Sequence, residues 1–369
     1  MNHTICPDCK GRGQKRLRPH KKIRVRYQNA LEHFEKNGGS VKAPVRPKGH
    51  LATCVTCGGS GLVASATPPL PDIENYPHVA IIGGGVGGTA LAVACLHRGI
   101  PFTLYERDSD FDVRSQGYGL TLQQARKAMK GFGIDSLAEG IISTRHVVHT
   151  TAGKVIGEWG MRKWLEEHKK TAAKRSNVHI ARQSLRLALL RKLGSNDAVQ
   201  WNHKLLDFQE NADETVSLNF EVGGKIETAT ADLVVGADGI RSEVRKLILG
   251  EAQTPLHYLD CIVILGICPL SAINGIESEL LDSATVFQTA NGTERIYMMP
   301  YDAESIMWQL SFHMPEEEAK ALSAYGAKAL KEEAYKRTPW HHPIPQIVAA
   351  TQTEQVSGYP VYDRELLKP

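Results

Sequence analysis

The feature that most constrains the fold is a glycine-rich stretch within residues 79–106. A short β-branched apolar run, Val79–Ile82, comes directly before the glycines, and a segment rich in small side chains follows them. Such a run predicts a buried parallel strand, and the glycines fit G-x-G-x-x-G at Gly83, Gly85 and Gly88. The order strand, glycine turn, helix predicts a Rossmann-like βαβ unit.

Each part of this motif has a physical task in binding a dinucleotide. Gly83 permits a tight turn, Gly85 lets a pyrophosphate approach the backbone, and Gly88 allows the helix to pack on the strand. The N-terminus of the helix, including Val86 and Gly87, offers free N–H groups and the positive end of the helix dipole to the phosphates. These five residues are therefore candidate cofactor ligands.

Glu106 stands at the end of the second strand of the unit, 18 residues after Gly88. A carboxylate at that position can accept hydrogen bonds from both hydroxyls of an adenosine ribose. We therefore place Glu106 and the adjoining Arg107 in a dinucleotide site. The alternative is a glycine-rich turn with a glutamate on the protein surface.

Length and charge predict more than one domain. A chain of 369 residues is long enough for two or three. No apolar run reaches the roughly 18 residues of a membrane span, so we expect no membrane among the partners of the protein. Four of the seven cysteines form two C-x-x-C pairs, which favours a reducing compartment, and we expect a cytoplasmic protein.

Residues 1–60 carry 13 Lys and Arg against three acidic residues, a net charge of +10, so a separate basic module is expected there.

Two copies of C-x-x-C-x-G-x-G mark this module. Each copy can place two thiolates on one tetrahedral metal ion while its glycines turn N–H groups toward the sulfurs. The candidate ligands are Cys6, Cys9, Cys54 and Cys57, and zinc is the metal that such a set favours. The motif resembles the zinc-binding half-sites of DnaJ-type chaperones. The alternative, a redox-active C-x-x-C, needs a thioredoxin-like βαβ context that the module lacks.

A basic segment lies between the two knuckles. Lys10 to Arg26 contain nine Lys and Arg and no acidic residue. Such density can bind nucleic-acid phosphates, but Tyr27 and Phe34 offer little aromatic surface for base stacking, so we prefer a solvated basic loop. Residues 64–77 predict a stiff proline-rich linker.

Three patterns in the rest of the chain indicate further elements of the fold and the site. Arg182 opens a predicted helix with leucines repeating on one face. Residues 200–208 predict one strand, and residues 232–239 predict a buried strand that ends in Gly-Ala-Asp-Gly, with Asp238 in the turn. After residue 255 the chain is rich in strands, and residues 316–337 predict one amphipathic helix.

Taken together, these motifs resemble those of the FAD-dependent aromatic hydroxylases, flavin monooxygenases of the para-hydroxybenzoate hydroxylase fold. The resemblance covers roughly residues 77–369 and is most specific at Gly-Ala-Asp-Gly-x-x-Ser-x-Val-Arg. It implies an α/β fold with a Rossmann-like FAD-binding domain and a β-rich substrate domain. The expected division is a zinc-knuckle module at 1–63, the linker at 64–77, the FAD-binding domain at 78–254 and the substrate domain at 255–369.

The resemblance also implies a chemistry. Asp238 would contact FAD and help to seat NAD(P)H, with Arg114 and Arg182 near the phosphate and ribityl portions. The implied reaction is hydroxylation of a small organic, aromatic or polycyclic substrate by O₂ at the expense of NAD(P)H. No catalytic acid, base or nucleophile is assigned. The alternatives are another FAD-linked oxidoreductase and a zinc-containing binding or adaptor protein whose flavin fold is inactive.

One feature of the family is missing from this sequence. In the family, an Asp-Arg segment similar to Asp363-Arg364 precedes a further strand and a Gly-Asp motif that closes over the ribityl chain. The chain contains no Gly-Asp pair. The sequence is therefore expected to be a truncated product, an incomplete gene model, or a family member that has lost part of its cofactor site. We expect this chain to bind FAD poorly and to be inactive.

Overall fold

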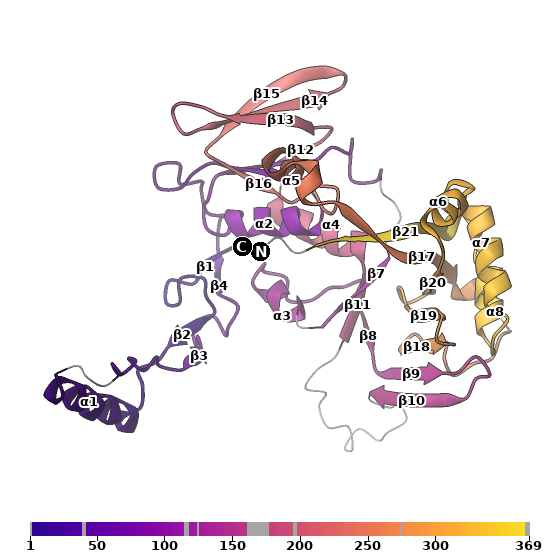
Figure 1. Ribbon diagram of the computed structural model, residues 1–369, viewed down its shortest axis with the longest axis horizontal. Coiled ribbons are helices and arrows are strands. Elements are labelled where there is room, and N and C mark those ends of the chain that lie inside the picture. Colours follow the sequence, from indigo (N-terminus) through magenta and orange to yellow (C-terminus); the bar gives the residue numbers. More distant parts are fainter. Residues whose placement is uncertain are drawn as a thin grey trace.

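The computed structural model describes residues 2–38, 42–113, 118–123, 125–160, 177–194, 198–273 and 275–365. Figure 1 shows a small N-terminal unit on one side, a central α/β region, and a large sheet with its helices on the other side. Within the described residues, we find no helix whose length and apolar character would suit a membrane span.

The central region is built on four parallel strands in the order β12-β6-β5-β16. The strands are β5 (Val79–Ile82), β6 (Phe102–Tyr105), β12 (Val199–Gln200) and β16 (Leu233–Gly236). Helix α2 (Val86–Leu96) begins directly after the first glycines. The predicted order of strand, glycine turn, helix and strand is confirmed, and Glu106 follows the last residue of β6.

Strand β5 is buried on both faces, as its apolar run predicts. Because successive side chains of a strand point to opposite faces, Val79 and Ile81 enter one core while Ala80 and Ile82 enter another. The first core also contains side chains of α2 and of α4 (Arg182–Leu193). A strand enclosed in this way fixes the position of the glycine turn at its end.

A three-stranded antiparallel sheet and a short helix close the second core. They are β13 (Lys204–Glu210), β14 (Val216–Val222), β15 (Lys225–Ala231) and α5 (Glu243–Leu249). The prediction of one strand over residues 200–208 is wrong. The chain turns at Asn202, where φ is 60°, and the residues on either side of the turn join different sheets.

The large sheet has seven strands in the order β10-β9-β18-β19-β20-β17-β21. The strands are β9 (Arg145–His149), β10 (Val155–Gly160), β17 (Leu256–Pro269), β18 (Thr285–Ala290), β19 (Glu294–Pro300), β20 (Ser305–His313) and β21 (Val356–Arg364). Strand β9 pairs in parallel with β18, and β10 pairs with β9. The sheet therefore includes two strands, β9 and β10, from the segment 78–254 expected to form the FAD-binding domain. The domain boundaries remain predictions.

Three helices cover one face of the large sheet and share its main core (Figure 1). They are α6 (Glu316–Ala324), α7 (Gly326–Arg337) and α8 (Ile344–Ala350). The prediction of one helix over residues 316–337 is wrong, because Gly326 has a φ of +84° and separates two helices. The opposite face of the sheet carries a smaller cluster that includes Leu265, Met299 and Met307.

A second small antiparallel sheet, in the order β7-β11-β8, adds to the core beside α2 and α4. It contains β7 (Gly119–Leu122), β8 (Ile141–Ser143) and β11 (Asn177–Ala181), and α3 (Ala125–Lys130) follows β7. Strand β11 leads directly into α4, so the predicted helix that opens at Arg182 is confirmed.

The N-terminal unit consists of two short antiparallel strand pairs and one helix. The pairs are β1 (Asn2–Ile5) with β4 (Leu62–Ser65), and β2 (Gln14–Arg16) with β3 (Leu51–Thr53). Helix α1 (Lys21–Lys36) lies between β2 and β3 in the sequence. The solvated loop expected over Lys10–Arg26 is therefore only partly a loop, since β2 and the start of α1 fall within it.

Candidate functional site

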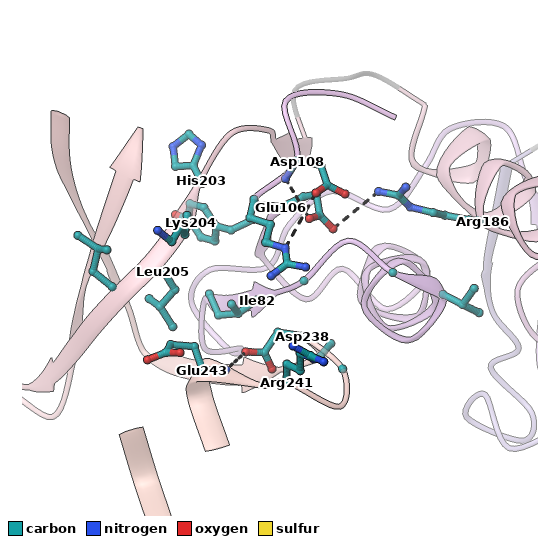
Figure 2. A pocket seen from close by; sticks show the side chains of 18 of the residues that line it. Ile82, Glu106, Asp108, Arg186, His203, Lys204, Leu205, Asp238, Arg241 and Glu243 are labelled. Atoms are coloured by element: carbon teal, nitrogen blue, oxygen red, sulfur yellow. Dashed lines mark hydrogen bonds and ion pairs between the residues drawn. The ribbon is translucent and has the colours of Figure 1, made fainter. Parts of the chain in front are cut away.

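A pocket of about 360 Å³ opens at the carboxyl ends of the parallel strands. Gly83 and Glu106, which directly follow β5 and β6, line it together with Asp238, which lies two residues after the end of β16. Figure 2 shows Glu106, Asp108 and Arg186 grouped on one side of the pocket, while Asp238, Arg241 and Glu243 lie on another. Ligands of open α/β sheets bind at this edge, where strand ends and helix N-termini meet.

The glycine turn contributes both close packing and open space. A Cβ on Gly88 would lie 1.9 Å from the carbonyl oxygen of Gly83, and Gly83 itself has a φ of +106°. A Cβ on Gly85 or Gly87 would meet no atom within 4 Å. Gly83 and Gly88 are therefore required by the fold, whereas Gly85 and Gly87 border free volume at the N-terminus of α2.

The carboxylate of Glu106 is buried and held from several directions. Its Oε2 accepts a hydrogen bond from the Gly84 N–H at 2.8 Å and lies 3.7 Å from Nη2 of Arg186. Its Oε1 accepts a hydrogen bond from the Asp108 N–H at 3.1 Å. A carboxylate has about four lone-pair positions, so Glu106 retains capacity to accept hydrogen bonds from a ligand in the pocket.

Sequence reasoning missed Arg186, which contacts both Glu106 and Gly84. Its Nε donates to the carbonyl oxygen of Gly84 at 2.7 Å, and its guanidinium lies over the rings of Phe111 and Trp201 at 5.1 and 5.4 Å. The sequence feature that could have identified Arg186 as a site residue is its position. It lies one helical turn after Arg182, on the helix face that carries the leucines. Other residues of the pocket that were missed are Asp108, Gln183, His203, Lys204 and Arg241.

Asp238 joins the pocket to the start of α5. Its Oδ2 accepts hydrogen bonds from the N–H groups of Glu243 and Val244 at 2.7 and 3.2 Å. Its Oδ1 is buried and has no hydrogen-bond partner among the residues that the structure describes. Buried acceptors are normally satisfied, so this oxygen is a position where a ligand hydroxyl could donate.

The structure brings most of the predicted cofactor residues together. Those that line the pocket are Gly83, Gly85, Val86, Glu106, Arg107, Arg182 and Asp238. Gly87 lines an adjoining cavity with Gly85, Arg182 and Asp238, and Gly88 is buried beneath the turn. Arg114 lies outside the described residues.

A second cavity, of about 400 Å³, lies between the start of α4 and the large sheet. Its lining consists of Tyr118, Arg182, Leu265, Gly266, Ile267, Met307, Gln355, Ser357 and Tyr359. The guanidinium of Arg182 lies 5.6 Å from the ring centroid of Tyr118, and burial raises the pKa of Tyr359. Because Arg182 lines both cavities, the second one adjoins the glycine pocket.

The two knuckles bring all four candidate metal ligands together. The Sγ atoms of Cys6, Cys9, Cys54 and Cys57 lie within 4.8 Å of one another, with Cys6 and Cys54 at 4.0 Å and Cys9 and Cys57 at 3.7 Å. Four sulfurs placed tetrahedrally at about 2.3 Å from zinc would be separated by about 3.8 Å. The cluster is thus close to the size that one zinc ion requires.

The backbone of the knuckles turns toward the sulfurs, as the glycines predict. Gly13 N–H donates to Sγ of Cys9, and Gly61 N–H donates to Sγ of Cys57, both at 3.2 Å. Burial raises the pKa of Cys9 to about 11. Burial also opposes the thiolate at Cys57, but the N–H groups of Gly61 and Gly59, together with hydrogen bonds from Cys9 and Cys54, outweigh it and lower the pKa to about 7. These donors stabilise negative charge on sulfur.

Comparison with known proteins places the chain among flavoproteins. The family described as FAD binding domain matches residues 76–356. A dual trans-enoyl reductase/FAD-dependent monooxygenase, tazHJ of Aspergillus terreus, is 32% identical over 181 residues, which are 49% of this chain and 25% of that protein. The chloroplastic zeaxanthin epoxidase of Oryza sativa subsp. japonica is 30% identical over 194 residues, 50% of this chain and 28% of the relative. The chain thus spans well under half the length of these relatives.

Solved structures support the same fold. The crystal structure of Klebsiella pneumoniae HpxO complexed with FAD and uric acid superposes with a TM-score of 0.63 at 20% sequence identity, covering 79% of this chain and 69% of HpxO. The predicted α/β fold with an FAD-binding region is confirmed by this likeness and by the family match. Because that match extends over most of the sequence, from the linker to the start of β21, the chain belongs to the FAD binding domain family.

Proposed function

We propose that FAD lies along the glycine pocket, with its pyrophosphate at the N-terminus of α2 and its adenosine ribose on Glu106. The open space above Gly85 and Gly87 supports the first placement, because two phosphates can reach the backbone N–H groups there. The remaining acceptor capacity of Glu106 supports the second. Arg107, whose side chain is 63% exposed and whose Nε lies 4.0 Å from Oδ1 of Asp108, lines the same pocket and adds positive charge to it.

The ribityl portion of FAD would then lie between Arg182 and Asp238. The buried Oδ1 of Asp238 supports this placement, because a ribityl hydroxyl would satisfy it. Arg182 lines the glycine pocket, the adjoining cavity and the second cavity, so it stands where the ribityl chain would lead toward the ring. The residues of this chain therefore fit FAD.

We propose further that the protein is an NAD(P)H-consuming monooxygenase. The observation that carries this proposal is the second cavity, which adjoins the cofactor pocket at Arg182. Its lining combines apolar side chains and two tyrosines with the polar side chains of Gln355 and Ser357. Bound flavin supplies electron transfer from NAD(P)H to O₂. Substrate C–H, O₂, NAD(P)H and a proton become substrate C–OH, NAD(P)⁺ and water. Leu265, Ile267 and Met307 would hold a small ring-bearing substrate and exclude water.

The test is substrate-stimulated consumption of NAD(P)H by the FAD-loaded protein. A panel of aromatic and polycyclic compounds is screened with isotopically labelled O₂, and products are analysed by mass spectrometry. We expect a stimulating compound to gain one labelled oxygen atom. The variant Met307→Trp, which fills the second cavity, should lose this stimulation and retain bound flavin. NAD(P)H consumption that yields only hydrogen peroxide with every compound would indicate an oxidase instead.

We propose that the cysteine cluster holds one structural zinc ion. The distances among its sulfurs and the N–H groups directed at Cys9 and Cys57 support this assignment. Metal analysis of the purified protein should give about one zinc per chain, from the four-ligand count. Cys54→Ser should lose the metal, and Cys261→Ser, outside the cluster, should retain it. Full zinc content in Cys54→Ser would refute the assignment.

We also propose the cytoplasm, or another reducing compartment, as the site of action. The seven cysteines are free thiols in the structure, and the four clustered thiols must stay reduced to bind metal. NAD(P)H as the electron donor is available in such a compartment.

A further inference from the structure

Helix α1 exposes an apolar stripe. None of its 16 residues is buried, and in Figure 1 it lies at the far end of the N-terminal unit, away from the sheets. Ile23, Tyr27, Ala30 and Phe34 recur at helical spacing on one face, with Leu31 beside them. Ile23 is 47% exposed. The stripe is therefore open to a partner.

Basic side chains border this stripe on both sides. At 100° per residue, Lys22 and Arg26 fall on one side of the stripe and Arg24 on the other, while Glu32 points away from it. All three cations are exposed. The side with Arg24 also carries the exposed Glu35, so the border of the stripe is predominantly basic rather than uniformly so. An amphipathic helix whose polar face is rich in Lys and Arg has the form that lies in the interface of a lipid bilayer.

The zinc-knuckle unit holds this helix in position. The Leu17 N–H donates to the carbonyl oxygen of His50 at 2.9 Å, and Nη1 of Arg16 donates to that of Gly49 at 2.9 Å. His20, directly before the helix, stacks on His50 with ring centroids 5.6 Å apart. The helix therefore projects from the end of the β2–β3 ribbon, and Arg16 and Arg18 add positive charge at its base.

We propose that α1 docks on the surface of an anionic lipid bilayer, with the apolar stripe among the acyl chains and the cations on lipid headgroups. The charge of the partner follows from the net +10 of residues 1–60. That charge opposes pairing with a second copy of the same unit. A nucleic acid would satisfy the cations but would leave the stripe exposed to water. A helix of 16 residues is about 24 Å long and lies on the bilayer without crossing it.

The test uses the full chain and vesicles of phosphatidylcholine alone or mixed equally with phosphatidylserine. We expect the protein to sediment with the mixed vesicles, to bind phosphatidylcholine at least tenfold more weakly, and to be released by salt. Ile23→Glu/Phe34→Glu should abolish binding, and Lys22→Gln/Arg24→Gln/Arg26→Gln should weaken it at least tenfold. Glu32→Gln, on the far face, is the matched control and should bind as the wild type does. Unchanged thermal unfolding would show that each variant folds.

Several results would overturn the proposal. Equal binding to both vesicle types, or full binding by Ile23→Glu/Phe34→Glu, would exclude an anionic bilayer as the partner of the stripe. If the protein ignores vesicles but binds duplex DNA or single-stranded RNA, and the stripe variant keeps that binding, the cations serve a nucleic acid. A dimer in sedimentation velocity that dissociates in the stripe variant, without vesicle binding, would assign the stripe to a second copy of the chain.

Discussion

Arg186 and Glu106 are 80 residues apart in the sequence, yet Nη2 of Arg186 lies 3.7 Å from Oε2 of Glu106, and both side chains are buried. Arg186 also donates to the carbonyl oxygen of Gly84, whose N–H donates to Glu106. The glycine turn, the end of β6 and helix α4 are thus joined by one guanidinium. This arrangement orients the carboxylate before any ligand arrives.

The first prediction concerns this guanidinium. Arg186→Gln should weaken FAD binding tenfold to a hundredfold, or about 1.5–3 kcal/mol, because Glu106 and Gly84 lose a charged hydrogen-bonding partner. Fluorescence titration of apoprotein with FAD measures the effect. Arg191→Ala, an exposed position on the same helix, is the matched control and should bind FAD as the wild type does. Equal affinity in Arg186→Gln would show that the guanidinium does not orient the site.

The second prediction separates the two kinds of glycine. Gly85→Ala should leave apoprotein stability within about 0.5 kcal/mol of wild type, since its φ is −71° and the new methyl meets no atom within 4 Å. It should nevertheless weaken FAD binding at least tenfold, because the methyl occupies the space proposed for the pyrophosphate. Gly88→Ala should instead destabilise the apoprotein by at least about 1–3 kcal/mol, since its methyl would overlap the Gly83 carbonyl. Urea unfolding and FAD titration of both variants distinguish these outcomes; a stable Gly88→Ala apoprotein would contradict the assignment.

The third prediction concerns the buried oxygen of Asp238. In Asp238→Asn the side chain can still accept from the N–H groups at the start of α5, but an NH₂ group replaces the buried acceptor Oδ1. FAD affinity should fall at least tenfold with little change in thermal unfolding. Ser242→Ala should have the opposite effect and lower the stability of the protein while leaving its FAD affinity unchanged. Its hydroxyl accepts from the Arg245 N–H at 3.0 Å, and loss of this cap should cost about 1 kcal/mol of stability without affecting FAD. Unaltered flavin binding in Asp238→Asn would remove the role proposed for Oδ1.

The fourth prediction concerns the pH dependence of stability. His179 is fully buried between Thr121 and Ser143, and burial, with a smaller contribution from His146, lowers its pKa to about 4. In the unfolded chain the pKa returns to about 6.5, so the unfolded state binds a proton that the folded state excludes. The free energy of unfolding should therefore fall as pH drops from about 6.5 to 4, by on the order of 3 kcal/mol, with no further loss from this group below pH 4.

Urea unfolding at a series of pH values measures this effect. His179→Gln keeps hydrogen-bonding groups but cannot titrate, so its stability should depend less steeply on pH in that window. His33→Gln, at an exposed position of α1, should follow the wild-type profile. Parallel profiles for wild type and His179→Gln would show that this histidine does not carry the dependence.

The sequence alone was sufficient wherever the determining interactions are local. The apolar run of β5, the glycine turn and the start of α2 are neighbours in the chain, so their order could be read directly, and Glu106 follows at the end of the next strand. The repeated C-x-x-C-x-G-x-G likewise predicted that four sulfurs could converge, because each half-site fixes two of them within one turn.

Only the tertiary structure decided which distant residues meet. Arg186 contacts Glu106 because α4 packs beside α2 in the core under β5, and no local pattern reports that contact. The same holds for β9, which joins the large sheet by pairing with β18. Arg145 of β9 lies opposite Thr285 of β18, which follows 140 residues later in the sequence. Arg182 borders two cavities for this reason as well. Hydrophobic periodicity records which face of an element is buried, but long-range packing selects the surface that covers it.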